Sequence, residues 1–281
     1  MQIKNQIIPG YNNKPMAVDI FYKNQKKLPV VIYHHGFNGF KDWANFDLIA
    51  SQFAEAGFVF VKFNTSHNGT TPQHPEDFVD LDAFGNNNYT KELFDLDQII
   101  NWICEPTNPH EPVLDLNNIF LIGHSRGGGV AIIKTAEDKR IKKLVTWASV
   151  AESKTPWGNW TKEKMEDWKQ KGVAYYSNSR TTQQMPLYYQ LYLDHETNSE
   201  RLDILKAAKT ITIPWLICHG TKDDAVPVEQ AYVLKEAALH AELFLVESDH
   251  VFDRKHPWEE ENLPFAMQQI VDKTGMFFTK Y

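Results

Sequence analysis

The residues from Gly123 to Gly127 read Gly-His-Ser-Arg-Gly and lie between two apolar runs, "NNIFLI" and "VAII". A glycine two positions before and after a serine, between a buried strand and a helix, is the pattern of a turn that exposes a strained nucleophilic serine. The two glycines leave room where the chains pass closely. The pattern predicts that Ser125 is a nucleophile, and Gly128 and Gly129 are expected to let the helix approach the sheet.

Two other glycine-rich patterns do not fit this segment. A phosphate-binding P-loop requires Lys and then Ser or Thr directly after its last glycine, and no such pair stands there. A dinucleotide-binding turn requires Gly-x-Gly-x-x-Gly, whereas Ser125 stands where the second glycine is needed. A reactive serine is the interpretation that remains.

A serine hydroxyl becomes an effective nucleophile only when a base removes its proton, so the chain should supply a histidine. His250, in "VESDHVFD", follows an apolar run and precedes the last expected helix. It is the predicted base. His124 adjoins the serine, but neighbouring side chains at a tight turn point apart, so we expect it to pack beside the turn. His256 is expected to be a structural loop residue near the last helix, with access to the pocket.

The histidine needs a carboxylate that fixes its tautomer and stabilises the imidazolium. The segment "CHGTKDDAVPV" follows another apolar run and offers Asp223 and Asp224. The spacing to the following Val-Pro favours Asp223, which would come first in the turn, and leaves Asp224 facing solvent or capping the following turn. Glu152, after the sixth expected strand, is a less favoured alternative.

The oxyanion of a tetrahedral intermediate needs two donors. The backbone N–H of Arg126 would be one, at the start of a helix whose dipole assists it. The segment "HHGFNGF" would supply the other, from the N–H of Phe37 after Gly36. His34 and His35 are not expected to bind a metal, because adjacent strand residues point to opposite faces; both are expected to pack near this loop.

The apolar pattern predicts eight strands and five helices that position these residues. A long polar loop covers 65–89, a length that usually indicates function. Alternating strands and helices predict a mostly parallel sheet covered on both faces. The expected strands are 2–8, 16–22, 28–35, 58–64, 117–123, 142–149, 213–220 and 241–247, and the expected helices are 46–57, 93–103, 127–137, 228–238 and one after Pro264.

An aromatic-rich segment, 151–210, interrupts this rhythm between the sixth and seventh strands. It contains three tryptophans and five tyrosines. We expect it to be an insertion over the carboxyl edge of the sheet, where open α/β sheets bind ligands.

Composition limits the function classes. The chain has 281 residues, 29 basic against 36 acidic, for a net charge of −7, which argues against nucleic acid or an anionic membrane as a partner. Neither a signal peptide nor an apolar run near the ~20 residues of a membrane span is visible. The two cysteines, Cys104 and Cys218, are expected to be free thiols, and no Cys or His cluster has metal-ligand spacing. The cytoplasm is the expected location.

The order Ser125, Asp223, His250, with a His-Gly loop after the third strand, resembles the α/β-hydrolase superfamily across essentially the whole chain. The resemblance implies a single domain, 1–281, whose eight-stranded, mostly parallel sheet has an antiparallel second strand and a cap insertion, 151–210, after strand six. The short cap and the "HGF" loop are similar to small bacterial serine esterases, including cinnamoyl (feruloyl) esterases and dienelactone-hydrolase-like proteins. Dienelactone hydrolases have a cysteine and haloalkane dehalogenases an aspartate where this chain has its serine.

The predicted function is therefore a serine carboxylesterase acting on a small-molecule ester, without a cofactor or a metal. Ser125 would attack the acyl carbon, His250 would act as base and then acid, and Asp223 would orient it. Small or aromatic acyl groups are expected because of the aromatic insertion. An amidase, a peptidase or a thioesterase would use the same residues, so these alternatives stay open, as does a homo-oligomer. A non-catalytic binding protein predicts a broken triad, which the sequence does not have.

Overall fold

The computed structural model describes residues 1–23, 26–178 and 180–280, and its centre is a twisted eight-stranded sheet. The strand order is β1-β2-β4-β3-β5-β6-β9-β10. β2 pairs antiparallel with β1 and β4, and the remaining neighbours are parallel, which confirms the predicted sheet. The strands are β1 (Gln2–Pro9), β2 (Pro15–Phe21), β3 (Leu28–His34), β4 (Val59–Phe63), β5 (Leu114–His124), β6 (Ile141–Trp147), β9 (Trp215–Gly220) and β10 (Glu242–Val246).

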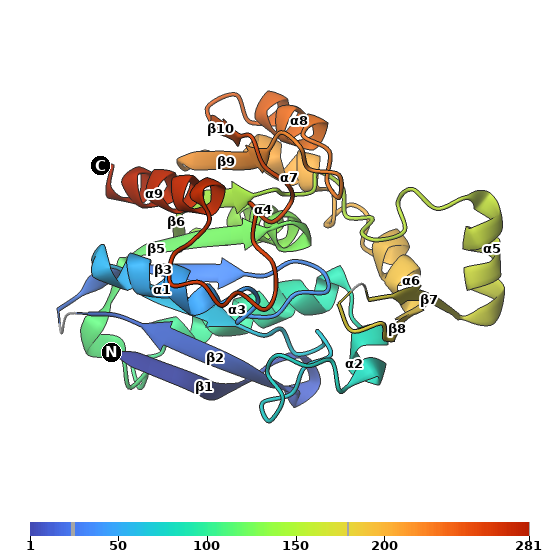
Figure 1. Ribbon diagram of the computed structural model, residues 1–281, viewed down its shortest axis with the longest axis horizontal. Helices are drawn as coiled ribbons and strands as arrows, with labels where there is room; N and C mark the ends of the chain where they lie inside the picture. Colours follow the sequence, from blue (N-terminus) through green and yellow to red (C-terminus); the bar gives the residue numbers. More distant parts are fainter. Residues whose placement is uncertain (24–25, 179, 281) are drawn as a thin grey trace.

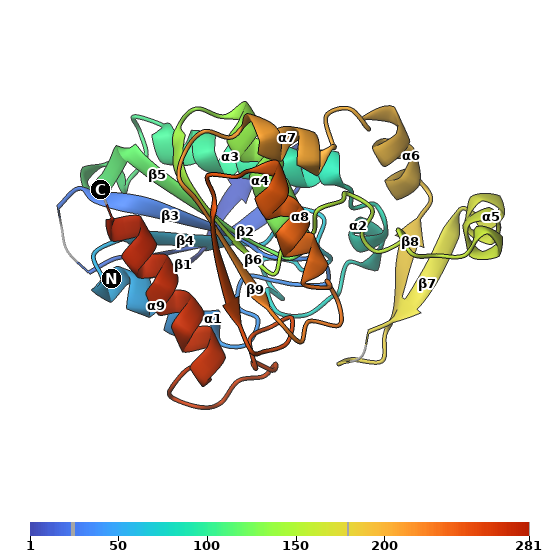
Figure 2. The ribbon, with the colours of Figure 1, turned by 90° about the horizontal axis from the view of Figure 1, so that it is seen from above.

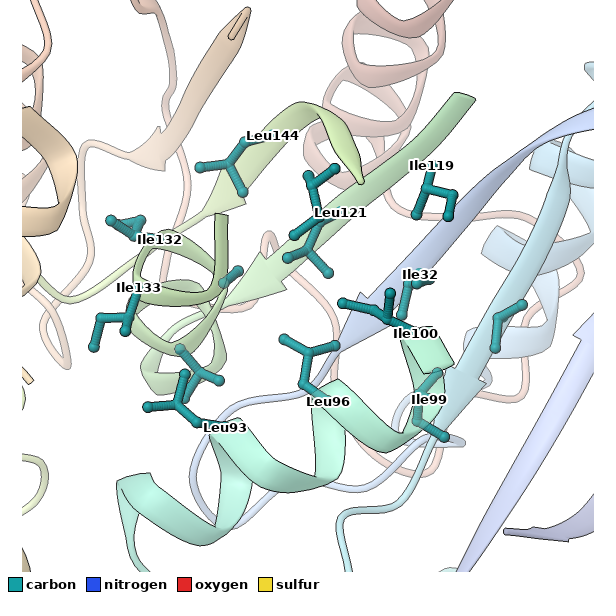
Figure 3. Close-up of a cluster of buried hydrophobic side chains, with 14 of the residues drawn as sticks. Ile32, Leu93, Leu96, Ile99, Ile100, Ile119, Leu121, Ile132, Ile133 and Leu144 are labelled. Atoms are coloured by element: carbon teal, nitrogen blue, oxygen red, sulfur yellow. The ribbon is translucent and has the colours of Figure 1, made fainter. Parts of the chain in front are cut away.

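Helices cover both faces of this sheet (Figure 2), which is why its central strands are apolar on both sides. One face carries α3 (Tyr89–Cys104), α4 (Arg126–Glu137), α7 (Ile204–Thr210) and α8 (Glu229–Ala237). The other carries α1 (Phe46–Glu55) and α9 (Phe265–Thr279). Figure 3 shows the first of these cores, where Leu96 of α3 points toward Leu121 of β5 and Leu93 lies on the side of α4. The sheet is thereby held rigidly between two apolar layers.

The insertion between β6 and β9 contains a hairpin that the apolar pattern did not predict. β7 (Val173–Ser177) and β8 (Gln184–Tyr188) form an antiparallel pair, flanked by α5 (Lys162–Lys171) and α6 (Gln190–Thr197). Figure 1 shows these four elements at the end of the molecule opposite the two termini. We call them the cap. α7, which follows the cap, packs instead against α4 and α8 of the main body.

The cap is fastened to the main body by an aromatic cluster. Trp157, Trp168 and Leu187 of the inserted segment pack with Phe40, Phe78 and Phe84. Phe84 lies in a short helix, α2 (Leu81–Gly85), within the long loop 65–89. This loop also bonds to the cap, because the Tyr188 hydroxyl donates to Asp82 at 3.0 Å. The long loop is therefore an ordered support for the cap.

Two single-turn 3-10 helices complete the described elements, Tyr11–Asn13 and Glu111–Val113. No helix within the described ranges is both long enough and apolar enough to cross a membrane.

Candidate active site

Ser125 occupies a sharp turn between β5 and α4. Its φ of 56° and ψ of −124° lie in a region that L-residues rarely adopt. Its N–H donates to the carbonyl of Trp147 at 2.9 Å, and its own carbonyl accepts from the N–H of Gly128 at 2.9 Å. The strained backbone is therefore held by the neighbouring strand on one side and by the helix on the other.

The glycines around the serine fill positions where a side chain would collide. A Cβ on Gly123 would lie 2.4 Å from the carbonyl oxygen of Gly127, and one on Gly127 would lie 2.2 Å from that of His35. A Cβ on Gly36 would lie 2.9 Å from the Cβ of Ser125. A Cβ on Gly128 would likewise lie 2.4 Å from Oγ of Ser149, in the loop that follows β6. These contacts are what the sequence pattern predicted the glycines to allow.

His250 and Asp223 form a hydrogen-bonded pair next to the serine turn. His250 Nδ1 donates to Asp223 Oδ2 at 2.7 Å. The other carboxylate oxygen, Oδ1, accepts from the N–H groups of Ala225 and Val226 at 2.9 and 2.8 Å. Asp223 is buried and Asp224 is exposed. Of the two adjacent aspartates, the structure therefore brings Asp223 to the histidine.

The carboxylate of Asp223 is held in its charged form. Burial alone would raise its pKa, but hydrogen bonds from His219 and His250 and the N–H of Val226 outweigh burial and hold the pKa well below its usual range. His219 Nε2 lies 3.3 Å from Asp223 Oδ2 and 2.8 Å from the carbonyl oxygen of Val226. Because both of those oxygens accept, His219 must carry its proton on Nε2.

Ser125 and His250 line two adjoining cavities. The first has a volume of about 870 Å³ and the second about 610 Å³. Phe37, Asn38 and Ala225 also line both, so the serine lies at the junction between them. A bound molecule with its reacting carbon at Ser125 can therefore place one part in each cavity.

The two expected oxyanion donors differ in their exposure to these cavities. Phe37 lines both, and no acceptor among the described residues takes its N–H. Arg126 is the first residue of α4 and lines neither cavity. Its buried guanidinium lies against α3, 4.2 Å from the ring centroid of Tyr89 and with Nε 3.1 Å from Glu92 Oε1, and its Nη1 donates to the carbonyl of Thr155 at 3.0 Å. Only its backbone N–H can serve at Ser125.

The other candidate histidines pack around the site. His124 Nε2 bonds the carbonyl oxygen of His250 at 3.0 Å, so His124 supports the loop of the predicted base. His256 lines the first cavity, and its Nδ1 accepts from the N–H of Ala44 at 2.9 Å. Both have lowered pKa values because burial disfavours the charged ring. These positions agree with the packing roles that the sequence predicted for them.

His34 and His35 are both buried, but their side chains do not point to opposite faces as predicted. Their ring centroids lie only 5.6 Å apart, because β3 ends at His34 and strand alternation stops there. Each Nδ1 donates to a backbone carbonyl at 2.8 Å, His34 to its neighbour and His35 to that of Gly36. Burial lowers both pKa values to about 4. Each ring therefore holds the loop backbone.

Among the described residues, one acidic cluster has the spacing of metal ligands, and a lysine occupies it. It consists of Asp19, Asp42 and Asp47. Lys62 Nζ lies 3.1 Å from Asp19 and 2.6 Å from Asp47 and also contacts Asp42, so an ammonium already fills the centre. The cluster is an ion-pair network that joins β2, β4, the loop after β3 and the first turn of α1.

Sequence reasoning missed three residues at the site. His219 was overlooked although it is the second-last residue of β9, four residues before Asp223. Asn178 of the cap loop donates to Asn38 Oδ1 at 3.0 Å, a contact over 140 positions that no local pattern indicates. Arg254 lines the first cavity, and its spacing of four residues from His250 was the available signal.

Comparisons with known proteins agree on the fold. A family model described as the alpha/beta hydrolase fold matches residues 29–163. A curated Mycoplasma genitalium protein named as an esterase or lipase is 30% identical over 123 residues, which cover 43% of this chain and 38% of that relative. The match thus spans well under half of the relative's length.

Solved structures resemble the whole chain at low identity. Est1E from Butyrivibrio proteoclasticus has a TM-score of 0.71 at 16% identity, over 99% of this chain and 98% of that one. It has also been solved with ferulic acid bound. An esterase domain from a Rhodothermus marinus protein has a TM-score of 0.64 at 15% identity, over 100% and 99% of the two chains. The sheet order, the turn at Ser125, the partial family match and these whole-chain similarities together show that the chain has the α/β-hydrolase fold.

Proposed function

We propose that this protein is a serine hydrolase that cleaves carboxylic esters through an acyl-enzyme intermediate. The observation that carries the proposal is the hydrogen bond from His250 Nδ1 to Asp223, beside a strained serine in the same cavity. A carboxylate on Nδ1 leaves Nε2 free to accept a proton. The esterase names among the similar proteins favour esters over other acyl substrates.

The proposed reaction has two half-reactions. Ser125 Oγ attacks the acyl carbon while His250 Nε2 takes its proton, and the N–H groups of Phe37 and Arg126 donate to the carbonyl oxygen as it becomes an anion. The C–O bond to the alcohol then breaks, and the imidazolium gives its proton to the leaving oxygen. Water, deprotonated by His250, attacks the acyl-enzyme and releases the acid and the free serine.

The substrate is proposed to be a small or aromatic ester. Two cavities meet at the serine, which suits an acyl group on one side and an alcohol on the other. Phe37 lines both cavities, and its ring centroid lies 5.6 Å from those of Phe84 and Tyr176, so aromatic surface lies close to Ser125. Feruloyl esters therefore belong in the substrate panel beside short aliphatic esters.

A fluorophosphonate that reacts with activated serines tests the nucleophile. The wild-type protein should be labelled, Ser125→Ala should not, and Ser199→Ala, a change at an exposed serine of the inserted segment, should be labelled as before. Labelling of Ser125→Ala at the wild-type rate would refute the assignment.

A panel of matched esters, thioesters and amides tests the reaction class. We expect a higher kcat/KM with esters than with amides, because an alkoxide is a better leaving group than an amide anion, and a kcat/KM for thioesters above that for esters would favour a thioesterase. Amide turnover that rivals ester turnover would instead favour an amidase or peptidase. No turnover on the whole panel would favour a binding protein with a hydrolase fold.

A further inference from the structure

The larger of the two cavities at Ser125 has an unusual charge. Arg180, Arg254 and Lys255 line it, and no aspartate or glutamate does in the part of the chain that the structure describes. The whole chain has seven more acidic than basic residues. The cavity beside the serine is therefore lined by an excess of positive charge, although the protein as a whole is negatively charged.

Arg254 is the most informative of the three because it is only 4% exposed. Its guanidinium lies 5.3 Å from the ring centroids of both Trp43 and Phe46, and its Nε donates to the carbonyl of Val251 at 3.1 Å. No carboxylate of the described residues pairs with it, and its buried Nη1 has no acceptor there. A buried charge is costly without a partner. An anion bound in the cavity would supply that partner.

Arg180 and Lys255 extend the positive charge from the buried wall to the mouth of the cavity. Both are exposed, and no carboxylate of the described residues forms an ion pair with either. The Arg180 guanidinium lies 5.6 Å from the ring centroid of Phe40, and its Nη2 donates to the backbone oxygen of Glu76 at 3.4 Å. Each retains charge that an incoming group can use.

The smaller cavity does not share this character. Its two lining charges, Glu152 and Lys154, form an ion pair at 3.1 Å. The excess positive charge is therefore confined to one side of Ser125, and it can distinguish the two halves of a substrate.

We infer that the half of the substrate bound in the larger cavity ends in a carboxylate, which Arg254 binds at the wall and Arg180 attracts at the mouth. The bordering rings of Phe40 and Trp43 would contact the carbon chain or ring that links this carboxylate to the ester. The inference rests on the proposed ester hydrolysis and specifies its substrate class: esters that bear a second, free carboxylate.

Two substrate pairs test the inference, each comparing a carboxylate with the neutral carboxamide of the same shape. On the acyl side, the 4-nitrophenyl monoester of adipic acid is compared with the same ester in which the free carboxylate is replaced by a carboxamide. On the alcohol side, the butanoyl ester of 4-hydroxybenzoate is compared with that of 4-hydroxybenzamide. We expect kcat/KM to favour the carboxylate by about tenfold or more in one pair, as a charged hydrogen bond provides.

Variants identify the residues responsible. Arg254→Gln should reduce the carboxylate preference about tenfold, Arg254→Lys should keep part of it, and Arg180→Gln should weaken it in a salt-dependent way. Arg201→Gln, at an exposed arginine paired with Glu137 instead, should not change it. If Arg254→Gln also abolishes turnover of the carboxamide, the substitution has disturbed the structure of the site as a whole. The carboxylate preference of Arg180→Gln then tests the inference in its place. Equal rates for carboxylate and carboxamide in both pairs would overturn the inference.

Calorimetry separates this inference from the proposed reaction. Ser125→Ala protein, with its arginines intact, should bind adipate or 4-hydroxybenzoate more tightly than the corresponding amides, and Arg254→Gln should remove the difference. Ester turnover without a carboxylate preference would refute the inference alone. Arg254-dependent binding without any ester turnover would refute the proposed function alone.

Discussion

The Nε2 atom of His124 lies 3.0 Å from the backbone carbonyl oxygen of His250, and the two ring centroids are 4.9 Å apart. A carbonyl oxygen only accepts, so His124 donates from Nε2. Burial, followed by the proximity of His250, keeps the pKa of His124 well below its usual range and the ring neutral. The residue beside the serine therefore positions the loop of the proposed base.

His124→Phe should lower kcat about tenfold, because it removes the donor that holds this loop, with a smaller effect on KM. His124→Gln, which retains a donor, should recover part of the loss. Steady-state kinetics on a 4-nitrophenyl ester measures both. If Phe and Gln have equal effects, the hydrogen bond is not the cause.

Asp223→Asn should reduce kcat by roughly 10³-fold or more, since an amide can favour the wrong tautomer of His250 and cannot stabilise its charge. Asp224→Asn is the matched control at the adjacent exposed residue and should remain within about twofold of wild type. Comparable losses in both variants would contradict the assignment of Asp223.

Stability should decrease as pH falls from 6.5 towards 4. Burial lowers the pKa values of His34, His35 and His67 to about 4, so in this range the unfolded chain binds more protons than the folded one. His34 and His35, which are fully buried, each contribute about 3 kcal/mol across this range at most, and the less buried His67 contributes less. Asp95 acts in the opposite direction, because burial raises its pKa to about 6 and it protonates more readily when folded. The lowered pKa of Asp223 gives stability that is lost only at more acidic pH.

Urea denaturation at pH 7, 6, 5 and 4 measures this trend as the free energy of unfolding. His67→Gln should show a shallower decline, because one of the histidines with a lowered pKa no longer contributes to it. A free energy that stays constant from pH 7 to 5 would be inconsistent with neutral buried histidines.

Two Gly→Ala changes should affect stability in opposite directions. Gly127→Ala places a Cβ 2.2 Å from the His35 carbonyl oxygen and should lower the free energy of unfolding by about 2 kcal/mol or more. Gly275→Ala, inside α9 with no described atom within 4 Å of its Cβ, should raise it by about 0.5–1 kcal/mol. Thermal unfolding measures both changes. An unchanged free energy of unfolding in Gly127→Ala would show that the turn can accommodate a Cβ there.

The sheet and the serine turn were predictable because their signals are local. Buried strands such as Val59–Phe63 are short apolar runs, and the glycines around Ser125 reflect steric contacts within a few residues. Asp223 was separable from Asp224 by its place in the turn. These features depend on short-range geometry, which the order of residues records directly.

The cap hairpin and the charge of the larger cavity were not predictable in the same way. β7 and β8 have no clear alternation of apolar and polar residues, because much of their packing is with aromatic residues from the long loop and from the segment after β3. Arg180 and Arg254 lie 74 positions apart and meet only through the fold. Chain contacts over such distances leave no periodic signal.

The hydrogen bond from Ser125 N–H to Trp147 has a consequence for motion. This amide is buried at the end of β5 and bonded to β6 at 2.9 Å, so its hydrogen can exchange with solvent only when the centre of the sheet opens. Its exchange should therefore be among the slowest in the chain, close to the rate of global unfolding. The residue proposed to react is thus one of the least mobile, and movement that admits a substrate must come from the cap and the surrounding loops.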